Sequence, residues 1–99
     1  MTASTINLAC QRGTKKVDAE VIGPFGIHAH PEKPQLWAIT HIETGRRVGS
    51  ALSPEHARKA ISRLSALPID WGFSDPKTIE MWPMGVMFAI HEIRAEAVT

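Results

Sequence analysis

Residues 35–52 read QLWAITHIETGRRVGSAL and hold the clearest local signal in the chain. Two short runs rich in strand-forming residues flank the turn Glu43-Thr44-Gly45, which predicts a β-hairpin. Ser53 and Pro54 follow directly. This pair is typical of a helix start, because Ser caps free N–H groups and Pro suits the first helical position. We therefore expect a strand–turn–strand–helix unit at the centre of the fold.

A register for the sheet follows from the turns. A three-residue turn with Gly45 in the left-handed region pairs Ile42 with Arg46 and Thr40 with Val48. Upstream, residues 21–30 predict a strand interrupted at Gly23-Pro24, because Pro lacks the N–H that a sheet ladder needs. A loop at residues 31–34 then sets His28 opposite Trp37.

In this register the two faces of the sheet differ in character. One face carries Phe25, Ile27, Leu36, Ile42, Val48 and Leu52, and the other carries His28, His30, Trp37, Ile39, His41 and Arg47. A slip of one residue would exchange these sets, because successive side chains in a strand point to opposite sides.

Two helices are expected after the hairpin. Apolar residues at helical spacing predict a first helix that ends before Pro68 and buries Ala57, Ala60, Ile61, Leu64 and Leu67. Asp75 and Pro76 begin a second helical stretch, and Pro83 lies inside it. Since an internal Pro costs about 3 kcal/mol in a helix, we expect one turn at residues 76–81 and a main helix from Pro83 to about residue 97. A single kinked helix is the alternative.

These elements define an α+β domain. The expected order is β-β-β-α-α, an antiparallel sheet of three strands followed by two helices. Residues 1–18 are polar and form either a flexible arm or a fourth, edge strand through Ile6 and Leu8. Residues 19–99 then make one small domain.

Composition excludes several classes of function. The 99 residues carry a net charge of +1, so there is no global electrostatic case for nucleic-acid binding. Residues 1–66 hold nine Lys/Arg against five Asp/Glu, and residues 67–99 hold two against five, which gives a basic and an acidic part. Cys10 is the single cysteine, which favours a reducing compartment. No run is apolar enough for a signal peptide or a membrane span, so we expect a cytoplasmic protein that does not bind a membrane.

No catalytic or cofactor motif stands out. Glycine-rich nucleotide loops are absent, and Cys10, Ser50 and Ser53 lack the context of an activated nucleophile. We expect neither an enzyme nor a cofactor. His28, His30 and His41 share a face in the preferred register, so a histidine metal site is a weak alternative to a protein without metal.

Basic and aromatic side chains indicate binding instead. Trp and Arg are the usual anchors of protein interfaces, which favours Trp37, His41, Arg46 and Arg47 as a protein-binding surface. Arg58, Lys59 and Arg63 on the first helix support it. Together with Lys15 and Lys16, the same arginines could form a basic surface, so a nucleic-acid-binding accessory domain is the alternative function.

One resemblance adds to this interpretation. The segment WAITHIETG at residues 37–45, with the Ala-rich helix and LPIDW at residues 67–71, resembles a pattern in small uncharacterised proteins of phages and mobile elements. The resemblance covers about a third of the chain. It implies an inhibitor or modulator, of anti-CRISPR or anti-restriction type, that binds a host protein or complex.

Met81, Met84, Met87 and Phe88 widen the apolar face of the second helix beyond one stripe. A homodimer would cover these additional apolar side chains.

Overall fold

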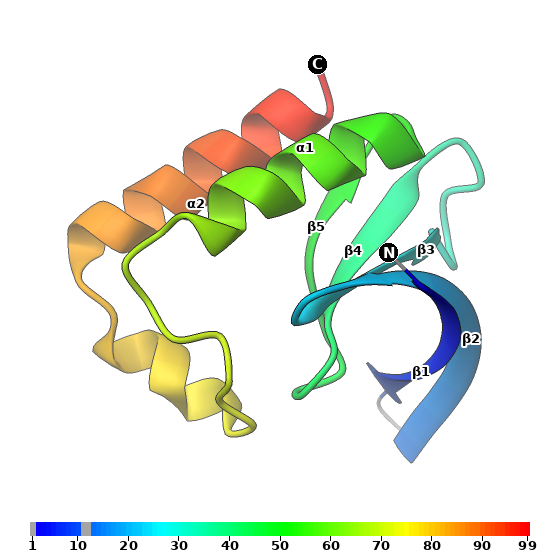
Figure 1. The fold of residues 1–99 in the computed structure, drawn as a ribbon, viewed down its shortest axis with the longest axis horizontal. Coiled ribbons are helices and arrows are strands. Elements are labelled where there is room, and N and C mark those ends of the chain that lie inside the picture. Colours follow the sequence, from blue (N-terminus) through cyan, green and yellow to red (C-terminus); the bar gives the residue numbers. More distant parts are fainter. Residues whose placement is uncertain (1, 11–12) are drawn as a thin grey trace.

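The computed structural model describes residues 2–10 and 13–99 (Figure 1). Its elements are β1 (Thr2–Cys10), β2 (Gly13–Ile22), β3 (Phe25–Ala29), β4 (Trp37–His41), β5 (Arg46–Ala51), α1 (Pro54–Ser65), a 3-10 helix η1 (Pro76–Met81) and α2 (Met84–Ala97). The strands form one antiparallel sheet in the order β1-β2-β3-β4-β5. The predicted class, an antiparallel sheet followed by two helices, is confirmed.

The expected strand count is wrong, because the described sheet has five strands. Strands β1 and β2 pair along their whole length, and the expected boundary between residues 18 and 19 lies inside β2. The alternation that marks them is short: Ile6, Leu8 and Ala19 are buried while most of their neighbours are exposed. Most of the surrounding residues are polar, so the sequence gives only a weak signal for strands that bury one face.

The interruption at Gly23-Pro24 is a turn between two strands. Ile22 pairs with Phe25, so Gly23 and Pro24 form a two-residue loop between β2 and β3. Gly23 has φ of +55°, a conformation that glycine adopts without steric cost. Pro is tolerated here because its position in the turn requires no ladder N–H. The expected single strand over residues 21–30 is therefore the end of one strand and the start of another.

The predicted register is displaced by one residue. His41 pairs with Arg46 and Thr40 with Arg47, with a bulge between Ile39 and Thr40. The loop of this hairpin therefore spans residues 42–45, and Gly45 has the expected positive φ, +70°. Across β3, His28 pairs with Ala38 and Ala29 with Trp37. The loop before β4 is longer than expected, and this moves β4 by one position.

The displacement changes what each face carries. Phe25, Ile27, Trp37, Ile39 and His41 share the face that α1 and α2 cover (Figure 1). His28, Thr40 and Arg47 lie on the opposite face, over which the β1–β2 hairpin curls (Figure 1). The predicted grouping of Trp37 and His41 with His28 and Arg47 is wrong.

Each face has its own apolar core. On the helix side, the largest fully buried apolar side chains are Phe25, Ile39, Ile61 and Leu64. On the other side, Ile6, Leu8 and Ala19 form a smaller cluster. The approach is close there, because a Cβ on Gly26 would lie 2.7 Å from Ile6 Cδ1. Gly26 thus permits the β1–β2 hairpin to fold onto the sheet.

The helix predictions are largely confirmed. Ser53 caps α1 by accepting a hydrogen bond from the His56 N–H at 3.1 Å, and Ala57, Ala60, Ile61 and Leu64 are buried. Pro83 separates η1 from α2 and is the N-cap of α2, so the single kinked helix does not form. Val86, Ile90, Ile93 and Ala97 are the buried residues of α2.

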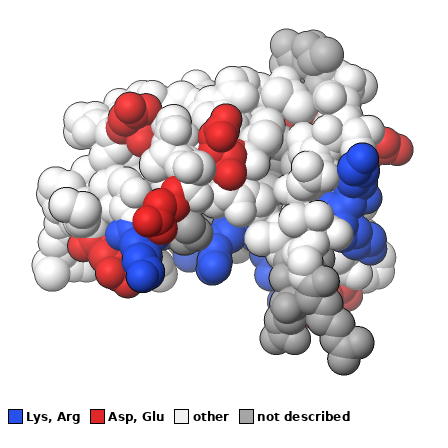
Figure 2. Space-filling view, turned by 90° about the horizontal axis from the view of Figure 1, so that it is seen from below, with Lys and Arg blue, Asp and Glu red and all other residues white. Residues whose placement is uncertain are grey.

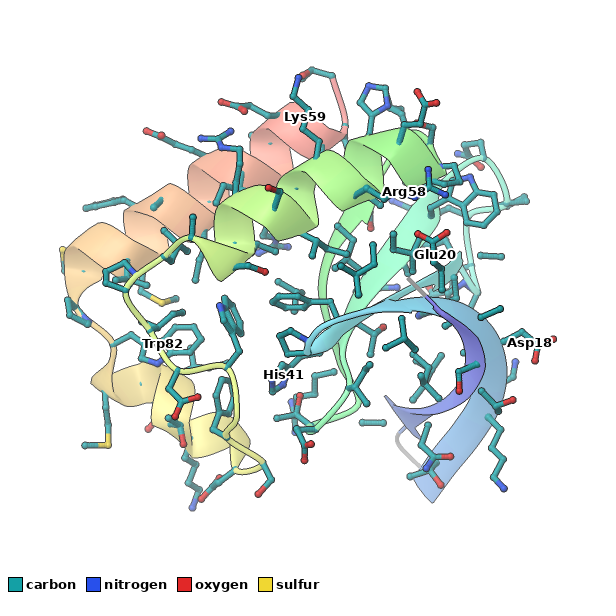
Figure 3. The ribbon with its side chains drawn as sticks, in the orientation of Figure 1. Asp18, Glu20, His41, Arg58, Lys59 and Trp82 are labelled. Carbon is teal, nitrogen blue, oxygen red and sulfur yellow. The ribbon has the colours of Figure 1, made fainter. Side chains whose placement is uncertain are left out.

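The connector between α1 and η1 is held by a histidine of the sheet. His41 Nε2 donates to the Trp71 carbonyl oxygen at 2.6 Å, and its ring stacks on Phe73 with centroids 4.5 Å apart. Trp71 contacts Phe25 and Trp82 edge-on, at 4.8 and 5.2 Å between centroids. Figure 3 shows His41 and Trp82 on facing sides of this aromatic cluster.

The curled sheet closes on itself at Gly45. The Ala9 N–H of β1 donates to the Gly45 carbonyl oxygen at 2.7 Å. A Cβ on Gly45 would lie 2.9 Å from Ala9 N and 3.0 Å from Asn7 O, and the positive φ adds strain for any other residue. Gly45 is therefore required by both its conformation and its neighbours.

We predict that Gly45→Ala lowers the free energy of unfolding by about 2 kcal/mol or more, because left-handed strain and a backbone contact add. The matched control is Gly85→Ala on α2, where a Cβ meets nothing within 4 Å. That control should be neutral or stabilising by up to about 1 kcal/mol. Urea unfolding of the two variants measures both. Equal effects would contradict the closure at Gly45.

Candidate interaction surfaces

The two expected aromatic anchors lie on the covered face of the sheet. Trp37 is half-buried and packs against the helix-side core. His41 is 2% exposed, and both ring nitrogens have partners, Trp71 O and Thr44 Oγ1. Both side chains lie on this face because β4 is displaced by one residue from the expected register. His41 therefore holds the fold through both ring nitrogens, and it also lines the pocket between η1, the β4–β5 hairpin and α2.

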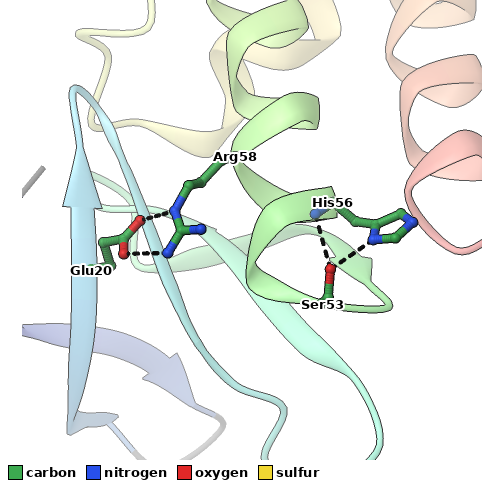
Figure 4. Close-up of polar contacts among 4 residues, drawn as sticks. All are labelled: Glu20, Ser53, His56 and Arg58. Carbon is green, nitrogen blue, oxygen red and sulfur yellow. Dashed lines mark hydrogen bonds and ion pairs between the residues drawn. The ribbon is translucent and has the colours of Figure 1, made fainter.

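The basic residues of α1 do not join the hairpin arginines. Arg58 donates to both carboxylate oxygens of Glu20, at 2.7 and 2.8 Å (Figure 4). The hydrogen bond to Arg58 lowers the pKa of Glu20, and the one to Glu20 raises the pKa of Arg58. Arg63 pairs with Glu96. Lys59 is exposed and points away from the sheet (Figure 3). The basic residues of α1 therefore do not form one surface with Arg46 and Arg47, and two of them are paired with carboxylates.

Arg46 and Arg47 lie at the start of β5 and are exposed, as expected for residues beside a turn. They line a cavity of about 720 Å³ on the side of the sheet opposite the helices. Lys15, His28, Glu32 and Thr40 line the same cavity. Figure 2 shows that both kinds of charge are mixed on the face seen from below: blue groups lie at the right, in the lower middle and at the lower left, and red groups lie mainly on the left with a few at the right edge.

The three histidines do not lie together on one face of the sheet. His28 Nδ1 donates to the Ala29 carbonyl oxygen at 2.9 Å, so His28 Nε2 accepts from Thr40 Oγ1 at 2.8 Å. His30 Nδ1 accepts from two backbone N–H groups, and His41 lies on the other face. Within residues 2–10 and 13–99, no group of three His, Cys, Asp or Glu side chains is placed to hold a metal ion.

A different surface stands out at the junction of η1 and α2. Met81 is 84% exposed, Met84 72%, Phe88 64% and Met87 40%. We call these four residues the apolar ridge. Met84 and Phe88 lie one turn apart on the side of α2 opposite its buried stripe, and Met81 precedes them at the end of η1. The sequence marks these residues as surplus to one apolar stripe, but only the packed fold shows that they are exposed.

A small pocket adjoins the ridge. It has a volume of about 210 Å³ and lies between η1, the β4–β5 hairpin and α2, with Met87 of the ridge in its wall. Its aromatic lining comes from His41, Trp71, Phe73 and Trp82. Arg46, Arg47 and Arg94 also line it, whereas no described carboxylate does. The pocket is therefore apolar with a basic border.

Comparisons with known proteins place no further constraint on the site. No protein-family model, no curated protein and no solved structure matched the chain. No described helix has the length and apolar character needed to cross a bilayer.

The buried histidines predict a pH dependence of stability. Burial lowers the pKa of His28 and of His30, and the charge of Arg47 lowers both further, although the Ala29 carbonyl raises that of His28. Their folded-state pKa values therefore lie below the ordinary 6.5. The unfolded chain then binds more protons, so stability falls as pH drops through 6.5 towards the folded pKa values.

We expect the urea midpoint to be lower at pH 5.5 than at pH 7.5, two values about one unit either side of an ordinary histidine pKa. His28→Gln should reduce this difference, because it removes one of the two histidines whose pKa is lowered by burial. His91→Gln, at an exposed position of α2, should leave it unchanged. A pH difference that is the same in wild type and His28→Gln would show that His28 does not contribute.

Proposed function

We propose that the chain is a small non-enzymatic interaction protein that binds another protein through the apolar ridge. The exposure of Met81, Met84 and Phe88 together is the observation that carries this proposal. Isolated apolar residues on a surface need no explanation, but neighbouring large ones mark binding sites. Methionine suits such a surface, because its flexible side chain adapts to different partners.

The chemistry around the ridge suggests the kind of partner. A partner that covers the ridge would reach the adjoining 210 Å³ pocket, whose aromatic lining accepts an apolar side chain. Arg46, Arg47 and Arg94 would then meet acidic groups beside that side chain. We therefore propose a partner surface with an apolar anchor flanked by carboxylates.

The sequence resemblance extends the proposal to a biological role. A phage or mobile element would use such a protein to modulate a host protein or complex, as an inhibitor of anti-CRISPR or anti-restriction type. Nucleic-acid binding through the hairpin arginines is the alternative, and salt separates the two. Phosphate contacts weaken steeply as salt rises, while an apolar interface loses far less.

The test is a tagged pull-down from nuclease-treated bacterial lysate at low and high salt. Wild type should retain the same proteins at both salt concentrations. Phe88→Asp should lose them, because it buries an unpaired charge in the interface. The matched control is Ala95→Asp, which adds the same charge two turns further along the exposed side of α2.

Thermal unfolding of the three proteins separates binding from stability, and we expect midpoints within about 4 °C of each other because both positions are exposed. Capture of the same proteins by wild type and Phe88→Asp would contradict the proposal. Capture that is seen only in a parallel lysate without nuclease, and that disappears at high salt, would favour the nucleic-acid alternative.

A further inference from the structure

We propose that the cavity on the concave side of the sheet is a phosphate-binding site formed by Lys15, Arg46 and Arg47. This site lies on the opposite face of the sheet from the helices. It shares Arg46 and Arg47 with the pocket beside the ridge but includes no residue of the ridge itself, so Phe88→Asp tests the proposed function without removing this site.

The strand register brings Lys15 and Arg47 to the same face of the sheet. Lys15 pairs with Leu8, which is buried on the concave side, so Lys15 faces the same side. Arg47 pairs with Thr40, whose hydroxyl bonds to His28 on that face. Lys15 and Arg47, which lie 32 positions apart in the sequence, therefore line one cavity. The bulge before Thr40 is what turns Arg47 towards it.

A contact with His30 holds the Arg47 side chain beside the cavity. His30 Nδ1 accepts from the N–H groups of Glu32 and Lys33, each at 3.1 Å. Arg47 NH1 lies 2.9 Å from His30 Nε2. A guanidinium has five N–H groups, so Arg47 has further donors for an oxygen atom of a bound anion.

The charges lining the cavity favour an anion. Lys15, Arg46 and Arg47 contribute three positive charges against the single carboxylate of Glu32. His28 adds no charge, because its hydrogen bonds to Thr40 and Ala29 match the neutral ring. Phosphate, which has several oxygens in different directions, suits donors that come from separate strands.

The phosphate could belong to a small phosphate ester or to a nucleic-acid backbone. Calorimetric titrations with pyrophosphate and with a single-stranded hexanucleotide distinguish the two sources. Both are run at constant ionic strength with chloride as the competing ion, because chloride then controls for nonspecific attraction.

Four variants test the residues. Lys15→Gln and Arg47→Gln should each weaken binding about tenfold, the effect of one lost charged hydrogen bond. Lys16→Gln is the matched control, since Lys16 is the next residue on β2 and faces the other side. Glu32→Gln should strengthen binding, because it removes the carboxylate. A gain of affinity cannot result from a folding defect.

Tighter binding of the hexanucleotide with the same residue dependence would support the site and assign the phosphate to a nucleic-acid backbone. Binding of pyrophosphate alone would support the site with a small phosphate ester. The proposal is overturned if neither probe binds. It is equally overturned if Lys16→Gln weakens binding as much as Lys15→Gln, because the attraction would then be nonspecific.

Discussion

The hydrogen bond from His41 to the Trp71 carbonyl is the contact on which the arrangement of the surfaces depends. Residues 66–75 have no regular secondary structure of their own, and they lead to η1 and α2. His41 ties them to the middle of the sheet, and the ring contacts of Trp71 with Phe25 and Trp82 extend the attachment to η1. Because buried polar groups are costly when unpaired, loss of either partner would loosen this connector. The apolar ridge then has a defined position because the connector below it is fixed.

The curled sheet has two separate surfaces, one on each face. The helices cover one face, and the β1–β2 hairpin covers part of the other and closes onto Gly45. The β4–β5 hairpin is common to both, since Arg46 and Arg47 line the concave cavity and the pocket beside the ridge. An anion on one side and a partner on the other would therefore compete for the same two guanidinium groups. Such competition would couple the two sites if both are occupied in the cell.

The predictions that are confirmed depend on the chemistry of single residues. The cap at Ser53, the break at Pro83 and the left-handed Gly45 follow from single residues, and all three are found where they are expected. The register of β4 is missed, because it depends on the bulge before Thr40 and on the length of the preceding loop. Arg58 looks free in the sequence because its partner, Glu20, is 38 positions away. The exposure of Met81, Met84 and Phe88 likewise depends on which side of α2 meets the sheet. Sites made by long-range packing therefore required the structure.

The most direct test of the ridge as a protein-binding surface is methyl NMR of protein labelled at the methionine methyl groups. Three of the four methionines in the chain belong to the ridge, so the spectrum reports on it almost alone. On addition of nuclease-treated bacterial lysate, the Met81, Met84 and Met87 signals should broaden or shift in wild type and stay unchanged in Phe88→Asp. Ridge signals that remain sharp and unshifted in wild type would contradict the account.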